Sequence, residues 1–174
     1  MSAPRASRPY MPGYGTLPAE EGSGLLPWSW AEERLRSARN YWVTSVRPDG
    51  TPHSMPVWGV WHERTFWFSS TGGSRKTRNL TENRRCVVAT EDAASPVILD
   101  GTAELIRDPA ALETLLRLEN QKYGTNYGME LLDPAVNACF QVHPIWAFAL
   151  KEEDFAGSPT RWTFDTNEDP DNTG

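Results

Sequence analysis

The stretch YWVTSVRPDGTPHSMPVWGVW, residues 41–61, contains two strand-like runs joined by a turn. The first run, Tyr41 to Val46, is rich in aromatic and β-branched residues, which favour a pleated strand. Pro48-Asp49-Gly50 is a turn sequence, because proline presets φ and glycine tolerates the left-handed position. The second run, His53 to Trp61, is predicted as the partner strand. Residues 41–61 therefore predict a β-hairpin.

The second strand of this hairpin has an irregular composition. Alternation places His53, Met55, Val57, Gly59 and Trp61 on one face, and the residues between them on the other. Pro56 cannot donate to a ladder, which indicates a sheet edge or a local irregularity. Free backbone groups at such a place can hydrogen-bond a flat heteroaromatic ring. A packed barrel strand with aromatic neighbours is the alternative interpretation.

A basic segment follows the third predicted strand, Thr65 to Ser70. Gly72 and Gly73 interrupt the strand, and Ser74 is a good N-cap for a helix predicted over residues 74–82. The sequence SRKTRNL, residues 74–80, places three cations and an amide at the start of this helix. Free N–H groups, the helix dipole and basic side chains together suit a phosphate. The alternative is a solvated basic turn.

Further strands and helices follow the same kinds of signal. Ser29 is predicted to cap a helix that runs to Ala38, and Asp108-Pro109 opens a helix that Gly124 ends. The remaining strand predictions are residues 85–90, 97–106, 137–142, 145–150 and 161–164. Many strands with interposed helices, without regular βαβ alternation, predict a mainly β fold: an antiparallel barrel with helical insertions.

Composition limits the classes of partner. The chain has 174 residues and a net charge of −6, which argues against nucleic acid as the main partner. Its apolar runs are too short to cross a bilayer, and Cys86 and Cys139 are predicted as buried thiols, so we expect a cytoplasmic protein without a membrane partner. Residues 1–24 are expected to form a flexible or docking arm, residues 25–165 the barrel domain and residues 166–174 a disordered acidic tail.

Several ordered motifs resemble the split β-barrel flavoproteins related to pyridoxamine 5′-phosphate oxidase. The hairpin, the runs FWFS (66–69) and RKTRNL (75–80), and VILDGTAE (97–104) follow in the order of that family. TRWTF (160–164) is similar to a closing motif of its deazaflavin-dependent, B-type branch. The resemblance extends over about residues 25–164.

The resemblance implies a homodimer of six-stranded split barrels, with a cofactor site in each groove between the subunits. By matched position, the ring of the cofactor would lie against Met55, Pro56, Val57 and Trp58. The ribityl chain would follow Phe68, Ser69, Ser70 and Thr71, and the phosphate would meet Arg75, Lys76 and Asn79. Arg161 and Trp162 would reach the same groove.

The branch suggested by the closing motif implies coenzyme F420 as cofactor, with FMN as the alternative. Pyridoxamine phosphate oxidases carry a histidine two residues after their closing arginine, and here Thr163 stands in that place. An F420-dependent oxidoreductase would transfer hydride to a conjugated C=C or C=N bond of a small planar organic substrate. The oligoglutamate tail of F420 would then meet Arg78, Arg84 and Arg85, unless these arginines are merely solvated.

The residues that would move protons are not identified by the sequence. His53 is the one histidine on a predicted site strand, and it is either a proton donor or a core or turn histidine. Tyr123 and Tyr127 either line the substrate mouth or belong to a loop that ends a helix. His62 and His143 have no metal-ligand spacing, so no metal is expected. A non-catalytic flavin- or heme-binding protein is a further alternative, in which His53 would be the axial ligand.

Overall fold

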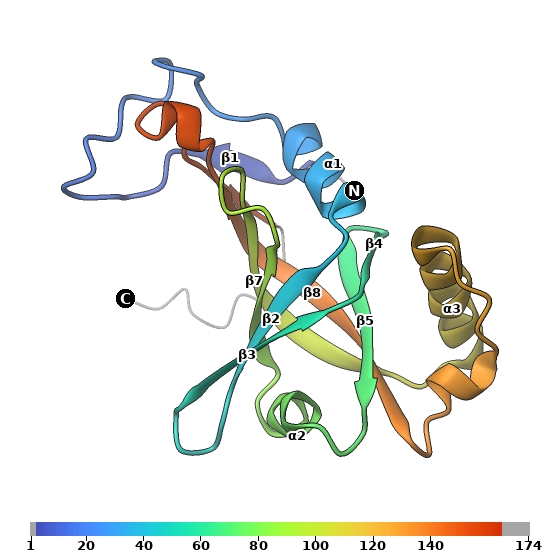
Figure 1. The fold of residues 1–174 in the computed structure, drawn as a ribbon. Coiled ribbons are helices and arrows are strands. Elements are labelled where there is room, and N and C mark those ends of the chain that lie inside the picture. The colour runs from blue at the N-terminus through green and yellow to red at the C-terminus, as the bar shows by residue number, and fades with distance from the viewer. Residues whose placement is uncertain (1–2, 165–174) are drawn as a thin grey trace.

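The computed structural model describes residues 3–164, whose nine strands form one antiparallel sheet (Figure 1). The strands are β1 (Arg5–Ser7), β2 (Tyr41–Val46), β3 (Pro52–Val57), β4 (Val60–His62), β5 (Thr65–Thr71), β6 (Arg85–Thr90), β7 (Val97–Ile106), β8 (Asn137–Ala149) and β9 (Thr160–Thr163). The helices are α1 (Trp28–Ser37), α2 (Arg75–Glu82) and α3 (Pro109–Tyr123), with 3₁₀ turns η1 (Met129–Leu132) and η2 (Glu152–Asp154). The prediction of a mainly β antiparallel fold with helical insertions is confirmed.

The sheet curls because the long strand β8 pairs with β7 along one edge and with two different strands along the other. Its first half pairs with β5, and its second half pairs with β9. The main path runs β1-β9-β8-β7-β6-β2-β3, and β4 pairs with β5. Within the described residues β3 pairs with β2 alone, so the barrel is split between β3 and β5. Helix α2 contacts β2, β3 and β5 across one end of the barrel, whereas α3 lies beside β4 and β5 (Figure 1).

The predicted hairpin forms, but its second strand is shorter than expected. Tyr41 faces Val57 and Val46 faces Pro52 across the pair. The strand predicted over residues 53–61 is interrupted at Trp58 and Gly59, where the chain leaves β2 and begins β4 against β5. A Cβ atom at position 59 would lie 2.3 Å from Cζ of Phe66, so only glycine fits at this break.

The barrel interior forms the main core. Buried side chains of the hairpin pack there against the phenylalanines of β5 and β8; Phe68 stacks between Phe66 and Phe140 at centroid separations of 5.9 and 5.3 Å. A second, smaller core lies between α3 and the outer side of β5 and β8. Its buried members include Leu112 and Leu115 of α3, the helix predicted between Asp108 and Gly124. Each face of β5 therefore contributes to a different core.

Two more local predictions were partly wrong. Helix α1 begins at Trp28 with Pro27 at its N-cap, so Ser29 lies inside the first turn rather than capping it. Residues 137–149 form one strand instead of two, because the ladder shifts register between Asp100 and Gly101 opposite Pro144. Glycine permits this shift: a Cβ atom at position 101 would lie 2.3 Å from the carbonyl oxygen of His143.

The N-terminal segment lies along its own barrel. Strand β1 pairs with β9, and Arg8 donates to the carbonyl of Pro159 at 2.6 Å. Farther along, the N–H of Ser23 donates to Asp154 at 2.6 Å. The part of the expected arm that the structure describes, residues 3–24, thus contacts β9 and the turn before it. The acidic tail predicted for residues 166–174 lies outside the described residues.

Candidate functional site

The N-terminus of α2 is a compact cluster of hydroxyl and basic groups at the end of β5. Ser74 caps the helix as predicted, and its hydroxyl accepts from the N–H of Thr77 at 3.2 Å. Nζ of Lys76 donates to Oγ of Ser70 at 3.0 Å, and that oxygen lies 2.9 Å from Oγ of Ser74. Because the first N–H groups of a helix have no partner within it, Arg75 and Lys76 present backbone donors here too.

Burial lowers the pKa of Lys76, while Arg75 beside it is exposed. The side chain of Thr77, which sequence reasoning missed, is buried and donates to the carbonyl of Thr71 at 3.0 Å. This bond fixes the loop of residues 71–74 on the first turn of the helix. We call the group Ser70, Thr71, Ser74, Arg75 and Lys76 the α2 cradle. It offers an anion several donors, a positive helix end and two cations.

Strand alternation separates the other residues predicted on β5. Phe68 and Ser70 share the inner face, and Phe68 is fully buried in the barrel core. Ser69 points the other way, on the same face as its cross-strand partner Cys139. Of this group, therefore, Ser70 belongs to the cradle through its side chain, and Thr71 through the backbone carbonyl that accepts from Thr77. The sequence predicted four consecutive positions, whereas a strand presents alternate ones to one face.

On β3 the predicted residues divide in the same way. Met55 lies opposite the buried Val43 and so faces inward, yet it is 44% exposed because the barrel is open beside β3. Val57 faces inward too and is buried. Pro56 lies opposite Trp42 on the outer face. Trp58 stands at the break after the strand, 39% exposed.

Two buried polar atoms near the split have no hydrogen-bond partner within the described residues. Asn79 donates through Nδ2 to Oγ of Ser45 on β2 at 3.0 Å, but its Oδ1 is unpaired. His53 lies opposite Ser45, and its Nδ1 is buried and unpaired as well. Asn79 is buried and bonded to β2, so the structure does not place it among the cradle groups that were predicted to hold a phosphate.

The two residues predicted on β9 lie on opposite faces of the sheet. Arg161 is exposed on the outer face, with its guanidinium carbon 4.9 Å from the ring centroid of Trp146. Trp162 is fully buried and packs edge-on against Trp28 at 5.5 Å. Its side chain is part of the core, so it does not line a surface groove of this subunit.

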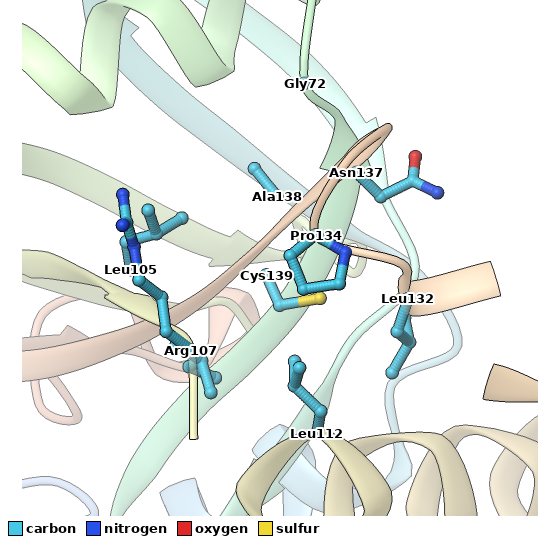
Figure 2. Close-up of a pocket in the computed structure, with 10 residues that line it drawn as sticks. Gly72, Leu105, Arg107, Leu112, Leu132, Pro134, Asn137, Ala138 and Cys139 are labelled. Atoms are coloured by element: carbon cyan, nitrogen blue, oxygen red, sulfur yellow. The ribbon is translucent and has the colours of Figure 1, made fainter. Parts of the chain in front are cut away.

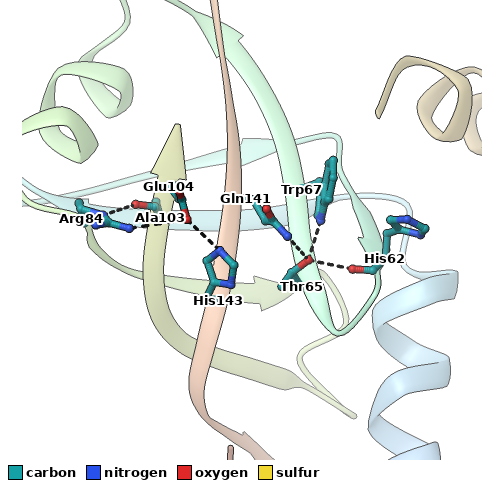
Figure 3. A network of polar contacts seen from close by, with 8 residues as sticks. All are labelled: His62, Thr65, Trp67, Arg84, Ala103, Glu104, Gln141 and His143. Atoms are coloured by element: carbon teal, nitrogen blue, oxygen red, sulfur yellow. Dashed lines mark hydrogen bonds and ion pairs between the residues drawn. The ribbon is translucent and has the colours of Figure 1, made fainter. Parts of the chain in front are cut away.

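Two of the three arginines considered for an oligoglutamate tail are already paired. Arg85 lies 2.5 Å from Asp100, and Arg84 donates to the carbonyl of Ala103 and lies 4.0 Å from Glu104 (Figure 3). Glu104 also lies 3.3 Å from Nε2 of His143. Only Arg78 of the three has no side-chain partner among residues 3–164.

A cavity of about 310 Å³ lies on the other side of the loop that forms the cradle (Figure 2). It opens between α3, η1 and the adjoining ends of β7 and β8. Its walls are mainly apolar, with Arg107 at one side; they are Gly72, Leu105, Ile106, Arg107, Leu112, Leu132, Pro134, Asn137, Ala138 and Cys139. Burial raises the pKa of the Cys139 thiol to about 12, so this sulfur is not a ready nucleophile.

A cluster of buried titratable groups at the end of α3 was not found from the sequence. Nζ of Lys122 donates to the hydroxyl of Tyr41 at 2.6 Å and to the carbonyl of Gly59 at 2.8 Å. Burial lowers the pKa of Lys122 to about 8 and raises that of Glu119 to about 7. Oε1 of Glu119 has no hydrogen-bond partner within residues 3–164. In the sequence both residues look like ordinary charges on a helix.

Glu119→Gln is expected to stabilise the protein at pH 8 by about 2 kcal/mol and to change little below about pH 4. The folded state raises the pKa of this carboxyl, so folding is favoured while Glu119 is protonated and loses stability as the pH rises from about 4.5 to 7. Glutamine stays neutral and avoids that loss. Urea unfolding at both pH values measures the difference, with Glu113→Gln on the exposed face of α3 as control. A gain that is equal at the two pH values would contradict this assignment.

Within residues 3–164 no group of three or more His, Cys, Asp and Glu side chains is placed to hold a metal ion. None of the described helices is both long and apolar enough to span a membrane.

Comparison with known proteins gives one family and many structures of the same fold. The family model of pyridoxamine 5′-phosphate oxidase matches residues 30–150. No curated protein matches the chain. A solved F420 reductase is 24% identical, with 68% of this chain and 95% of that chain covered and a TM-score of 0.56.

Two more structures support the same fold. A conserved hypothetical protein from Mycobacterium tuberculosis is 16% identical over 85% of this chain and 95% of its own, with a TM-score of 0.67. A putative pyridoxamine 5′-phosphate oxidase from Listeria innocua is 17% identical over 71% and 94%, with a TM-score of 0.55. At these identities the structures establish the shared fold.

Proposed function

Because this chain belongs to the pyridoxamine 5′-phosphate oxidase family, we propose that it is an oxidoreductase that uses reduced coenzyme F420. Its substrate would be a small planar organic molecule with a conjugated C=C or C=N bond. The α2 cradle is the observation that carries this proposal. The likeness to an F420 reductase and the closing motif Thr160 to Phe164 favour the deazaflavin over other cofactors.

The residues present fit a flavin-type cofactor with a phosphate. Arg75, Lys76 and the hydroxyls of Ser70 and Ser74 would hold the phosphate at the positive end of α2. Met55 and Trp58, both partly exposed beside the split, would lie against the ring. Oδ1 of Asn79 and Nδ1 of His53, which have no hydrogen-bond partner within the described residues, would be available for hydrogen bonds to the cofactor near β3. When bound, the reduced deazaflavin supplies the hydride.

The protein's part in such a reaction is binding, orientation and the exclusion of water. The ring would lie along the open edge of β3, where backbone groups are free of a second ladder. The apolar side chain of Met55 limits water there. His53, whose Nδ1 is buried, is the nearest titratable side chain on the same strand and would hold the proton that follows the hydride.

The groove would be completed by a second copy of the chain. One cross-strand row on the outer face of the sheet joins Pro56, Trp42, Ala89, Ile98, Phe148 and Arg161. Five of its six members are apolar, and Trp42 is 46% exposed. An apolar row of this kind suits a two-fold interface, since the same patch meets itself. Pro56 and Arg161, both predicted site residues, stand at the two ends of this row and would therefore lie at the same interface.

Trp42→Asp is expected to convert the dimer into a monomer with little change in fold. A buried unpaired carboxylate within the apolar part of the row would cost several kcal/mol of association energy. Sedimentation equilibrium measures the mass, and circular dichroism checks the fold. Tyr127→Asp is a matched control, because Tyr127 is 47% exposed on the loop after α3. A wild-type protein that sediments as a monomer would refute the interface.

FMN is the second candidate cofactor, and one observation favours it. Arg84 and Arg85 are engaged by Glu104 and Asp100, which leaves Arg78 alone for an oligoglutamate tail. FMN has the ring and phosphate but no such tail, so the α2 cradle would supply all the basic side chains that FMN needs for binding.

Single-turnover reduction distinguishes the two candidates. Purified protein is mixed anaerobically with reduced F420 or reduced FMN and with a panel of planar conjugated acceptors. We expect oxidation of F420 to depend on both protein and acceptor, and oxidation of FMN to proceed at the rate without protein. The reverse pattern would assign the FMN alternative, and no acceleration with either cofactor would refute the oxidoreductase proposal.

A further inference from the structure

The backbone at Gly59 is held by two side chains that come from outside the barrel. The N–H of Gly59 donates to the hydroxyl oxygen of Tyr123 at 2.8 Å. The carbonyl of Gly59 accepts from Nζ of Lys122 at 2.8 Å. Both residues stand at the C-terminal end of α3. The two backbone groups of the strand break, which no ladder serves, are thus satisfied by one helix end.

Each of these side chains is fixed by a further bond. The hydroxyl of Tyr123 donates its proton to the carbonyl of Arg39 at 2.7 Å, in the segment between α1 and β2. Lys122 donates a second time to the hydroxyl of Tyr41, the first residue of β2. The end of α3 is therefore tied both to the start of β2 and to the break that follows β3, and its two polar groups have little freedom to shift.

The same helix end also sets the orientation of Trp58. The rings of Trp58 and Tyr123 are parallel within 4°, with their centroids 4.2 Å apart. The guanidinium carbon of Arg39 lies 5.7 Å from the centroid of Tyr123. One face of the Trp58 indole is thus covered by Tyr123, which is itself almost wholly buried, while the side chain remains 39% exposed.

We propose that Lys122 and Tyr123 are positioning residues that hold the Trp58 end of β3 in place, so that β3 presents a defined surface to the cofactor ring. The part of this inference that concerns the cofactor rests on the function proposed above. Within the described residues β3 has one ladder partner, β2, and after Val57 that ladder ends. The bonds from α3 replace the missing strand at this point, and Phe66 behind Gly59 prevents inward movement.

Two variants remove the bonds and keep most of the packing. Tyr123→Phe retains the ring against Trp58 and loses the hydroxyl, and Lys122→Met retains the apolar stem and loses the ammonium. Leu115→Val is the control, because Leu115 on the inner face of α3 is fully buried in the second core and makes no contact with Gly59, so its substitution lowers stability without removing these bonds. Two NMR signals report the position directly: the amide of Gly59 and the indole N–H of Trp58, the latter assigned by comparison with Trp58→Phe.

In Tyr123→Phe we expect amide exchange at Gly59 to become at least about 100-fold faster. Exchange at Val43 in β2 should change only by as much as the global free energy of unfolding changes. The Trp58 indole signal should shift in both variants and stay unchanged in Leu115→Val. In the folded variants the dissociation constant of F420 should rise about tenfold, which is the change in affinity expected from the loss of one hydrogen bond.

Unchanged exchange at Gly59 and an unchanged Trp58 signal would overturn the inference. It would also be overturned if affinity fell equally in Leu115→Val, because the effect would then follow stability alone. If the wild-type protein bound neither F420 nor FMN, the proposed function would fail, whereas the exchange and indole signals would still decide whether Lys122 and Tyr123 hold this end of β3.

Discussion

Replacing Arg75 and Lys76 together by alanine is expected to weaken the binding of F420 at least about 100-fold. Each side chain offers the phosphate a charge-assisted hydrogen bond worth about 1.5–3 kcal/mol, and a loss of about 3 kcal/mol in total is a factor of about 100. Lys76 is partly buried and already directed toward Ser70, so little ordering is needed when an anion binds. Equilibrium titration followed by tryptophan fluorescence measures the effect.

The control for this experiment is a second double variant with the same change of charge. Arg107 and Arg117 are exposed beside and on α3, and neither belongs to the α2 cradle, so their replacement by alanine should leave the affinity within about twofold. Circular dichroism and thermal unfolding establish that both double variants are folded. If the two double variants bind F420 equally well, then the phosphate does not lie at the α2 cradle.

Trp162→Ala is expected to lower the free energy of unfolding by about 3–5 kcal/mol, the usual cost of a large aromatic deletion in a core. Trp162 is fully buried and packs against Trp28, the central ring of an aromatic group that also includes Trp61 and Phe164. Its removal would leave a cavity between α1 and the barrel. Urea unfolding at neutral pH measures the change.

The companion variant Trp162→Phe separates the structural role of this residue from a role in binding. Phenylalanine keeps much of the ring packing, and it removes an indole Nε1 that is buried without a partner in the described residues. We expect a smaller loss of stability, about 1–2 kcal/mol, and no change in the affinity for F420. A tenfold loss of affinity in folded Trp162→Phe would show that the residue contacts the cofactor, as its place in the closing motif first indicated.

Local signals predicted the elements around the site well. The Pro48-Asp49-Gly50 turn and the capping residues Ser74 and Asp108 act over three or four residues, and the structure has the hairpin, α2 and α3 where these signals put them. The position of residues 70–76 could be predicted for the same reason, because the end of β5 and the cap of α2 are adjacent in the chain.

Contacts between distant segments could not be predicted in this way. The register shift at Gly101 depends on a carbonyl in β8, and the break at Gly59 depends on Phe66 and on the end of α3. Matched positions also gave no information on side-chain direction, so Phe68 and Trp162 were placed in the groove although each faces the core. Lys122 acts on a residue more than sixty positions away, and no local pattern marks it.

Parallel titration of the wild-type protein with F420, FMN and riboflavin tests the central claim most directly. Trp58 stands beside the proposed ring position, so binding should quench tryptophan fluorescence. We expect saturable quenching by micromolar F420, weaker binding of FMN, and little binding of riboflavin, which has the ring of FMN without its phosphate. Quenching by FMN with no response to F420 would contradict the F420 assignment, and equal affinity for FMN and riboflavin would contradict the phosphate cradle itself.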